Sequence, residues 1–376
     1  MVQTALPDTG RIPAVDGLRG IAILSVMIFH FRSFGGSLGT ALWEKLYANF
    51  ADLGTVGVDL FFVISGFLIT GILFDSRSRP SYYSTFFVRR TLRIFPIYYA
   101  SLILFLLFAP PAFASNWQIF AWLYGLNWPI GLFGFSFAPP LLQHFWTLSV
   151  EEQFDLAWPK VVRTLDRKRL IFACAMLIWI SFAFRVTVCL LNLPIAASVW
   201  TVCRLDSLGI GAIVALSMRD DRDWAVLRKA AAKLALFATA GLILIIVWNG
   251  PPVSANIWMR TIGIGLRAIL FGGLLVMLLN APVGSVLQRA ACSPFLRFFG
   301  KYSYGLYVCH QPLILILGSY GFNFEALDDR LHNKVLAVLA VNAITLLPSI
   351  AIAWVSWHAL EKHFLKLKEL PALQLN

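Results

Sequence analysis

The chain has 376 residues, of which 59% are hydrophobic and only 13% are charged. Its mean hydropathy of +0.75 and the bunching of charged residues between long apolar runs exclude a soluble globule. The same figures exclude disordered, collagen-like and small disulfide-framework proteins. The net charge of +12 does not predict a nucleic-acid partner, because the Lys and Arg residues lie in short loops and not on one solvated face with stacking aromatics. The composition predicts a polytopic membrane protein, whose surroundings are the lipid bilayer.

Apolar stretches of about 20 residues, the length at which a helix crosses ~30 Å of hydrocarbon, occur ten times along the chain. In chain order, the expected spans are 17–34, 52–74, 89–109, 145–162, 170–191, 196–217, 234–249, 259–279, 302–319 and 335–357. A further apolar stretch, 117–142, is broken by Pro129, Pro139 and Pro140 and by Gly131 and Gly134, so we expect a partial or re-entrant element there. No internal repeat is found. The expected fold is therefore all-α, with residues 1–376 forming a single membrane domain.

Basic residues predict the orientation of this bundle, because loops on the cytoplasmic side are enriched in Lys and Arg. With the N-terminus in the cytoplasm, 23 of the 31 basic residues lie on the inner side, five lie outside and three lie within spans. A full crossing by 117–142 would invert every later loop. The pattern therefore predicts ten crossings with both termini cytoplasmic.

Cysteine usage argues against disulfides and metal sites. The five cysteines form no CxxC motif and mostly lie inside apolar runs, where a free thiol behaves as a small hydrophobe. No Walker loop, GxGxxG or HExxH motif occurs in the chain. We therefore expect no bound metal and no resident cofactor.

The first span carries two ionisable residues on one face. Arg19 lies at its cytoplasmic end and His30 follows eleven residues later. At 100° and 1.5 Å per residue, the two side chains lie within about 20° of the same helical face and about 16 Å apart along it. An ionisable group inside a membrane helix is by default a hypothesis for a functional site. The structural alternative is a histidine that hydrogen-bonds to a neighbouring carbonyl group.

Three carboxylates are expected at about the depth of His30. Asp59 lies in the outer part of the second span, and Glu151 and Glu152 lie in the outer part of the fourth, with His144 at its mouth. A histidine with carboxylates nearby is suited to proton abstraction, because a carboxylate fixes its tautomer and stabilises the imidazolium. These residues form a candidate catalytic group. In the alternative, the carboxylates compensate the charges of the three arginines within spans, which are Arg185, Arg204 and Arg267.

An arginine cluster opens the third span at the cytoplasmic side. Arg89, Arg90 and Arg93 crowd one helical sector, because residues three and four apart are neighbours on a helix. Guanidinium groups match phosphate oxygens two at a time, so the cluster is a candidate phosphate site. The alternative is a topological anchor of the kind that many spans carry.

Further polar residues lie inside later spans as candidate supporting groups. Arg204 and Asp206 are two residues apart in the sixth span, so they point to different faces and each needs a partner on another helix. The ninth span carries Tyr304 and His310, followed by Pro312, which predicts a kink. His310 is either a direct participant or a structural histidine.

Six ordered motifs identify a family. They are DGLRGIAILSVMIFH, GVDLFFVISGFLIT, RRTLRIFPIYY, FWTLSVEEQF, RLDSLGIGAI and KYSYGLYVCHQPL. Together they extend over essentially the whole chain, which resembles the acyltransferase-3 family of integral membrane acyltransferases. Asp155 departs from the family pattern, which usually has Tyr at that position. The resemblance is to stand-alone members that lack a fused esterase-like domain.

The resemblance implies transfer of an acyl group, usually acetyl, from cytoplasmic acyl-CoA to a hydroxyl group. The acceptor is expected to be a carbohydrate, a lipid-linked glycan or a secondary metabolite, and the location a bacterial inner or plasma membrane. Carried over to this chain, the family's Arg-x10-His pair falls on Arg19 and His30, with His30 as the catalytic residue. The family's arginine motif falls on Arg89, Arg90 and Arg93 as the acyl-CoA site, and its acidic motif on Glu151 and Glu152.

A transporter of an anionic solute or a lipid-linked sugar is the alternative function, because buried His, Glu and Arg residues also occur in transporters. Many transporters have inverted repeats and discontinuous helices in matched positions. The first and last five spans show no such repeat, so the acyltransferase is preferred.

Overall fold

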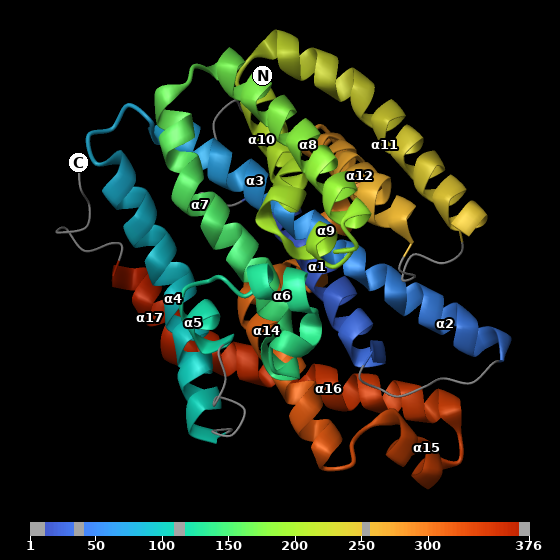
Figure 1. Cartoon of the computed structure of the whole chain (residues 1–376). Helices are drawn as coiled ribbons and strands as arrows, with labels where there is room; N and C mark the ends of the chain where they lie inside the picture. Colours follow the sequence, from blue (N-terminus) through green and yellow to red (C-terminus); the bar gives the residue numbers. More distant parts are fainter. Residues whose placement is uncertain (1–11, 34–40, 109–116, 250–255, 368–376) are drawn as a thin grey trace.

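The structure of the chain is a computed structural model that describes residues 12–33, 41–108, 117–249 and 256–367 (Figure 1). Within these ranges all regular structure is helical. Seven helical stretches of the described residues are long and apolar enough to cross a membrane, which fits an all-α polytopic bundle. They comprise α1 (Pro13–Ser33), α2 with α3 (Leu42–Asp52 and Val56–Ser76), α4 (Tyr82–Phe108), α8 (Arg167–Leu190), α11 (Asp221–Asn249), η6 with α12 (Met259–Gly263 and Ile264–Leu279), and α16 to α17 (Lys334–Ser356, Trp357–Glu361 as η7, and Lys362–Leu367).

The other three expected spans also coincide with helical segments of the described chain. The stretch 145–162 corresponds to α7 (Trp146–Thr164), and 302–319 to the C-terminal part of α14 (Pro294–Ser319). Both helices are more polar than the seven above; α7 alone carries five charged residues between positions 151 and 163. The number of ten crossings therefore stays a prediction, whereas the helical bundle itself is confirmed.

The stretch 196–217 is not one helix. It consists of α9 (Ala196–Val199), a 3₁₀ turn η5 (Thr201–Arg204) and α10 (Leu205–Ser217). The interruption is stabilised by α8, where Ser181 Oγ donates to the carbonyl oxygen of Val202 at 2.8 Å and Arg185 Nη1 donates to that of Cys203 at 2.7 Å. Buried carbonyl groups need such partners. Since α10 has 13 residues, it is about 20 Å long and shorter than the hydrocarbon core.

The predicted interruption of 117–142 is confirmed. This stretch contains α5 (Trp117–Trp122), α6 (Asn127–Phe133), η3 (Phe135–Phe137) and the start of η4 (Pro140–Phe145). Gly134 ends α6 with a φ of 88°, a conformation that favours glycine. Tyr98 Oη on α4 donates to the carbonyl oxygen of Ala121 at 2.7 Å and ties α5 to the bundle. These short elements lead the chain into the start of α7.

Two close helix contacts organise the interior. α10 lies between α3, α8 and α12, and α1 packs along α14 (Figure 1). At the second contact, a Cβ on Gly20 would collide with the carbonyl group of Leu296, and one on Gly300 would collide with that of Asp16. Small residues allow helix backbones to approach this closely in membrane proteins. The α1–α14 contact holds two of the residues described below at a fixed distance.

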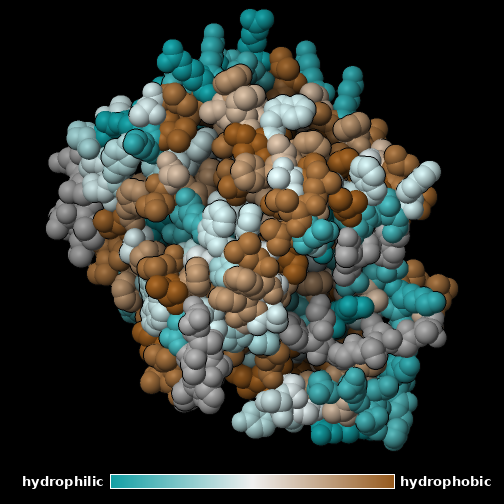
Figure 2. Space-filling view, viewed as in Figure 1, coloured by the Kyte–Doolittle hydropathy of each residue, from teal (hydrophilic) through white to brown (hydrophobic). Residues whose placement is uncertain are grey.

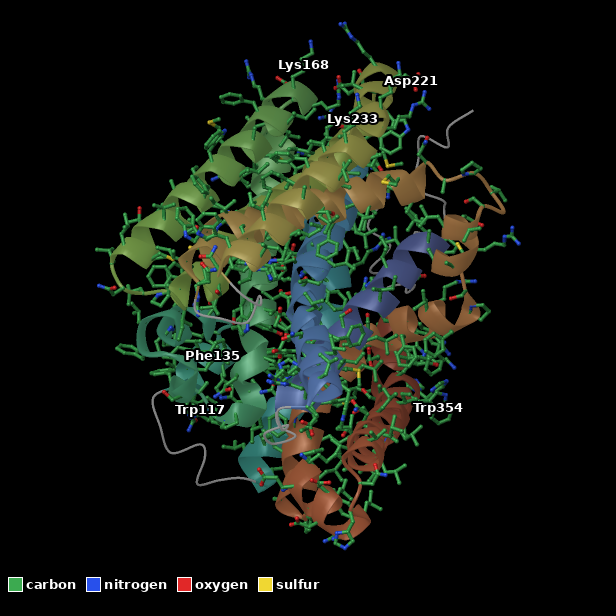
Figure 3. The ribbon with its side chains drawn as sticks, turned by 90° about the vertical axis from the view of Figure 1, so that its right-hand side faces the viewer. Trp117, Phe135, Lys168, Asp221, Lys233 and Trp354 are labelled. Atoms are coloured by element: carbon green, nitrogen blue, oxygen red, sulfur yellow. The ribbon has the colours of Figure 1, made fainter. Side chains whose placement is uncertain are left out.

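One end of the molecule is strongly hydrophilic. On the face shown in Figure 2, hydrophilic residues gather at the upper end and hydrophobic residues cover the middle. Lys168, Asp221 and Lys233 lie at this end, whereas Trp117 and Phe135 lie toward the other (Figure 3). Loops that the basic-residue pattern predicts to be cytoplasmic therefore lie at this hydrophilic end.

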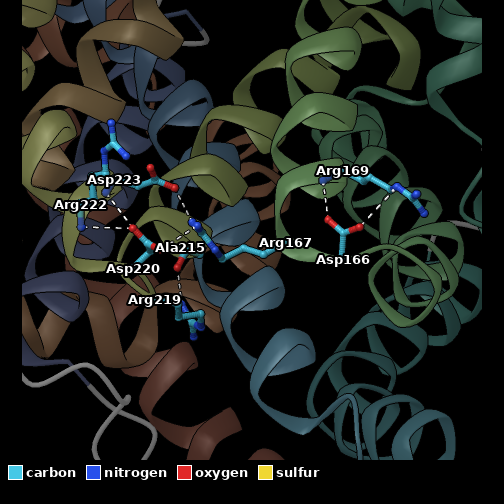
Figure 4. A network of polar contacts seen from close by, with 8 residues as sticks. All are labelled: Asp166, Arg167, Arg169, Ala215, Arg219, Asp220, Arg222 and Asp223. Carbon is cyan, nitrogen blue, oxygen red and sulfur yellow. Dashed lines mark hydrogen bonds and ion pairs between the residues drawn. The ribbon is translucent and has the colours of Figure 1, made fainter.

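A network of charged side chains joins the loops at this hydrophilic end (Figure 4). Arg167 binds Asp220 at 2.9 Å and Asp223 at 2.5 Å, which connects the start of α8 to the start of α11. A hydrogen bond from the backbone N–H of Asp223, together with the Arg167 guanidinium, holds the pKa of Asp220 below its ordinary value of 3.8. These contacts are partly exposed to solvent, so they orient the two helices more than they stabilise the fold.

A candidate active site of three histidines

Three histidines from distant parts of the chain lie together in the bundle. His30 is on α1, His144 is on η4 directly before α7, and His310 is on α14. The ring centroids of His30 and His310 are 4.9 Å apart, those of His144 and His310 5.2 Å, and those of His30 and His144 6.5 Å. His144 and His310 are buried and His30 is partly buried. We call these residues the histidine cluster.

Hydrogen bonds define which nitrogens of His310 and His30 carry protons. His310 Nδ1 lies 3.0 Å from the carbonyl oxygen of Leu306 and 2.8 Å from that of Tyr307. Carbonyl oxygens only accept, so His310 Nδ1 carries the proton and Nε2 of the neutral ring carries the lone pair. That Nε2 lies 3.1 Å from His30 Nδ1, which also lies 3.0 Å from the carbonyl oxygen of Val26. His30 Nδ1 is therefore a donor, and the lone pair of neutral His30 is on Nε2.

This arrangement orients a basic nitrogen. The proton on His30 Nδ1 is shared between two acceptors, His310 Nε2 and the carbonyl oxygen of Val26, and His310 is held in turn by the backbone of its own helix. If His30 Nε2 takes up a proton, Nδ1 keeps its acceptor and the imidazolium is stabilised by a hydrogen bond. A base oriented by a second group in this way is the arrangement that general base catalysis requires.

α14 also positions the segment that carries His144. Tyr307 Oη donates to the carbonyl oxygen of His144 at 2.7 Å and lies 2.5 Å from Thr147 Oγ1. Gln311 Nε2 donates to the carbonyl oxygen of Pro140 at the start of η4. Positions 307, 310 and 311 share one face of a helix because they are three and four residues apart. One helical face therefore supports both His30 and the η4 segment.

The structure places Asp59 in an ion-pair network. Its carboxylate pairs with Arg204 and, at 3.1 Å, with Arg267, and it is 1% exposed. Asp59 lies in the first turn of α3, where the helix dipole also stabilises a negative charge. These contacts correspond to the charge-compensation alternative.

The second buried pair involves the supporting candidate Asp206. Arg185 Nη1 lies 2.6 Å from Asp206 Oδ2, and both side chains are fully buried. Arg185 Nε donates to the carbonyl oxygen of Thr261 at 3.0 Å. Arg185 thus connects α8, α10 and η6, so the partners that Arg204 and Asp206 need are Asp59 and Arg185.

The two glutamates of α7 have different partners. Glu151 Oε1 accepts a hydrogen bond of 2.6 Å from Ser65 Oγ on α3. Glu152 Oε1 lies 2.9 Å from Arg90 Nη2, and Arg90 also pairs with Asp155. Asp155, the residue that departs from the family pattern, is thus a buried partner of an arginine from the cluster on α4.

The other members of the arginine cluster have more open surroundings. Arg89 and Arg93 are exposed, and Arg93 interacts electrostatically with Glu361 at the end of η7. Arg19 is partly exposed and lies on the same uninterrupted helix as His30, as expected. Tyr304 Oη donates to the carbonyl oxygen of Ile94 at 2.8 Å and so joins α14 to α4. Among the described residues, no group of three or more His, Cys, Asp or Glu side chains could hold a metal ion.

Sequence reasoning missed the position of His144 inside the cluster. It treated this residue as lying at the mouth of a span, although the structure places it against His310. The sequence does carry a signal for this contact. Tyr307, His310 and Gln311 are spaced three and four residues apart on the ninth span, so they form a polar helix face that needs a polar partner.

The fold and the histidine cluster define a polytopic helical membrane protein with a polar site inside its bundle. Residues 12–358 match the model of the acyltransferase-3 family, described as an acyltransferase domain. The chain belongs to that family.

Two curated relatives extend this comparison. Peptidoglycan O-acetyltransferase OatA of Listeria monocytogenes serovar 1/2a is 25% identical over 347 residues, which cover 84% of this chain and 51% of the relative. O-acetyltransferase OatA of Staphylococcus aureus (strain NCTC 8325 / PS 47) is 26% identical over 333 residues, which cover 82% of this chain and 51% of the relative. The chain thus spans about half the length of these relatives. No solved structure matches it.

Proposed function

We propose that this chain is a membrane O-acyltransferase that moves an acetyl group from acyl-CoA to a hydroxyl group of a glycan. Family membership supports the reaction class. The names of both relatives support an O-acetyl product, and the name of the Listeria relative supports peptidoglycan as the kind of acceptor. The single observation that carries the proposal is the hydrogen bond between His30 and His310, which leaves the basic nitrogen of His30 on Nε2.

In the proposed reaction, His30 Nε2 takes the proton of the acceptor hydroxyl while the hydroxyl oxygen attacks the thioester carbonyl carbon. A C–O bond forms, the C–S bond breaks, and the proton is passed to the departing thiolate to give CoA. His310 is a positioning residue, because it accepts from His30 Nδ1 and stabilises the imidazolium. Asp59, Glu151 and Glu152 support the site through ion pairs and hydrogen bonds with neighbouring helices.

We further propose that acyl-CoA enters from the cytoplasmic side, with its phosphates on the arginine cluster. Arg89 and Arg93 are exposed in the N-terminal half of α4, and the guanidinium fork suits phosphate. Arg19 lies on α1 about 16 Å from His30, toward the end of the helix that is expected to face the cytoplasm. The pantetheine arm would extend along this distance toward the histidine cluster.

Purified protein assayed with radiolabelled acetyl-CoA and soluble peptidoglycan fragments tests the proposal. Wild-type protein should release CoA and form an ester-linked acetyl group. His30→Gln keeps hydrogen-bonding atoms but cannot take up a proton, so it should lose about 10²–10⁴-fold in turnover. It should insert, fold and bind acetyl-CoA like the wild type.

Near-normal turnover by His30→Gln would exclude His30 as the base and direct attention to Glu151, Glu152 or Asp59. Release of CoA by wild-type protein without any ester product would exclude this glycan as the acceptor. Accumulation of an anionic solute or lipid-linked sugar across vesicles, without ester formation, would support the transporter.

A further inference from the structure

His144 has an unusual environment for a buried histidine. Its side chain is 3% exposed, and neither ring nitrogen has a hydrogen-bond partner among the described residues. The carbonyl groups of Tyr307 and Val308 lie near the ring, but neither has hydrogen-bonding geometry. Buried polar groups in folded proteins are nearly always paired, so an unpaired imidazole needs an explanation.

The backbone of His144, in contrast, is firmly held. Its carbonyl oxygen accepts hydrogen bonds from Tyr307 Oη at 2.7 Å and from Thr147 Oγ1 at 3.2 Å. His310, its neighbour in the cluster, uses both ring nitrogens in hydrogen bonds. The protein therefore fixes the position of the His144 ring without using its polar atoms. This combination is expected for a group that is prepared for a ligand.

We propose that His144 is a second catalytic residue, whose ring N–H donates a hydrogen bond to the carbonyl oxygen of the acyl group. This inference rests on the proposed function. The His30 and His144 ring centroids are 6.5 Å apart, a separation at which a base on one ring and a donor on the other can both contact one acyl group that lies beside the two rings. When the acceptor oxygen attacks, the carbonyl π electrons move to the oxygen that faces His144. They return as the C–S bond breaks.

The test compares two phenylalanine substitutions in the cluster. His144→Phe keeps a ring of similar size and removes two unpaired nitrogens, so Tm should stay the same or rise. Turnover with acetyl-CoA and soluble peptidoglycan fragments should fall about 10²–10³-fold, the usual loss for one oxyanion donor, with KM for acetyl-CoA changed by less than about threefold. The matched control, His310→Phe, should lower Tm, because it breaks the hydrogen bonds of a satisfied histidine.

His144→Gln provides a second readout, because an amide N–H can replace the imidazole N–H. It should recover part of the turnover lost in His144→Phe, which a purely structural histidine would not explain. The inference is overturned if His144→Phe has turnover within about threefold of wild type. It is also overturned if this variant unfolds or loses as much Tm as His310→Phe, because the ring would then be structural. A wild-type protein that forms no ester would instead refute the proposed function.

Discussion

At the scale of single residues, the arginine cluster divides into members with different surroundings. Arg90 is bound by the carboxylates of Asp155, which is buried, and Glu152, which is partly buried. Arg89 and Arg93 are exposed at the surface of α4. A shared helical sector therefore does not imply a shared role.

We expect Arg93→Ala to weaken acyl-CoA binding about tenfold to a hundredfold, because a hydrogen bond between charged groups contributes roughly 1.5–3 kcal/mol. Its Tm should change little. Arg93→Lys should recover only part of the affinity, since Lys lacks the guanidinium fork. Binding by calorimetry and Tm by thermal scanning check both statements.

Arg90→Ala is the contrasting variant. It removes the positive partner of the buried Asp155 and the partly buried Glu152, and breaking a buried ion pair typically costs about 3–5 kcal/mol of stability. It should therefore lower Tm more than Arg93→Ala does. Unchanged acyl-CoA affinity in both Arg89→Ala and Arg93→Ala would show that these residues are only topological anchors.

Much of the residue-level site could be predicted from the sequence, but the pairings could not. Ionisable groups within apolar stretches were visible, as were Arg19 and His30 on one face. Which carboxylate meets which arginine depends on helix packing, which a period of 3.6 residues does not encode. Asp59 was expected either near His30 or as the partner of one of three arginines, and its ion pairs are with two of those arginines, Arg204 and Arg267.

At the scale of helices, the α1–α14 contact determines the geometry of the site. Gly20 and Gly300 let the two backbones approach until no Cβ fits between them. His30 and His310 extend from the same two helices and form a hydrogen bond of 3.1 Å. A separation of these helices would lengthen that bond.

Gly300→Ala should therefore reduce both stability and turnover. Overpacking a close contact typically costs 1–3 kcal/mol, and the histidine pair should lose its geometry. Gly318→Ala is a matched control on the same helix, because a Cβ there meets nothing within 4 Å. The control should keep activity and have equal or higher Tm, since Ala favours helices. Equal Tm and turnover in the two variants would contradict this view of the contact.

Two breaks in the helices differ in whether the local sequence pattern predicts them. The break in 117–142 was predictable, because prolines and glycines mark it. The break between α9 and α10 has no such marker, since Ser181 and Arg185 from α8 stabilise it through the carbonyl groups of Val202 and Cys203. A break supported by tertiary contacts is invisible to hydropathy and helix propensity.

At the scale of the whole molecule, the basic residues predict a single orientation in the membrane. Arg79 and Arg228 are expected in the cytoplasm, whereas α15 (Phe324–Leu331) is expected outside. Single-cysteine variants at positions 79 and 228 in a cysteine-free background should resist an impermeant thiol reagent added to intact cells. A cysteine in place of the exposed Asp329 should react. Labelling at 79 or 228 from outside would refute the orientation.

The histidine cluster also has a consequence for biosynthesis. His30 and His310 are 280 residues apart in the chain, so α1 leaves the ribosome long before α14 is made. The first helix must enter the membrane with its histidine still lacking this neighbour. The pair can form only when the ninth expected span has been inserted and packed. A nascent or prematurely terminated chain that ends before α14 thus carries His30 without the neighbour that positions it, and the histidine pair is completed only after α14 has been synthesised and packed.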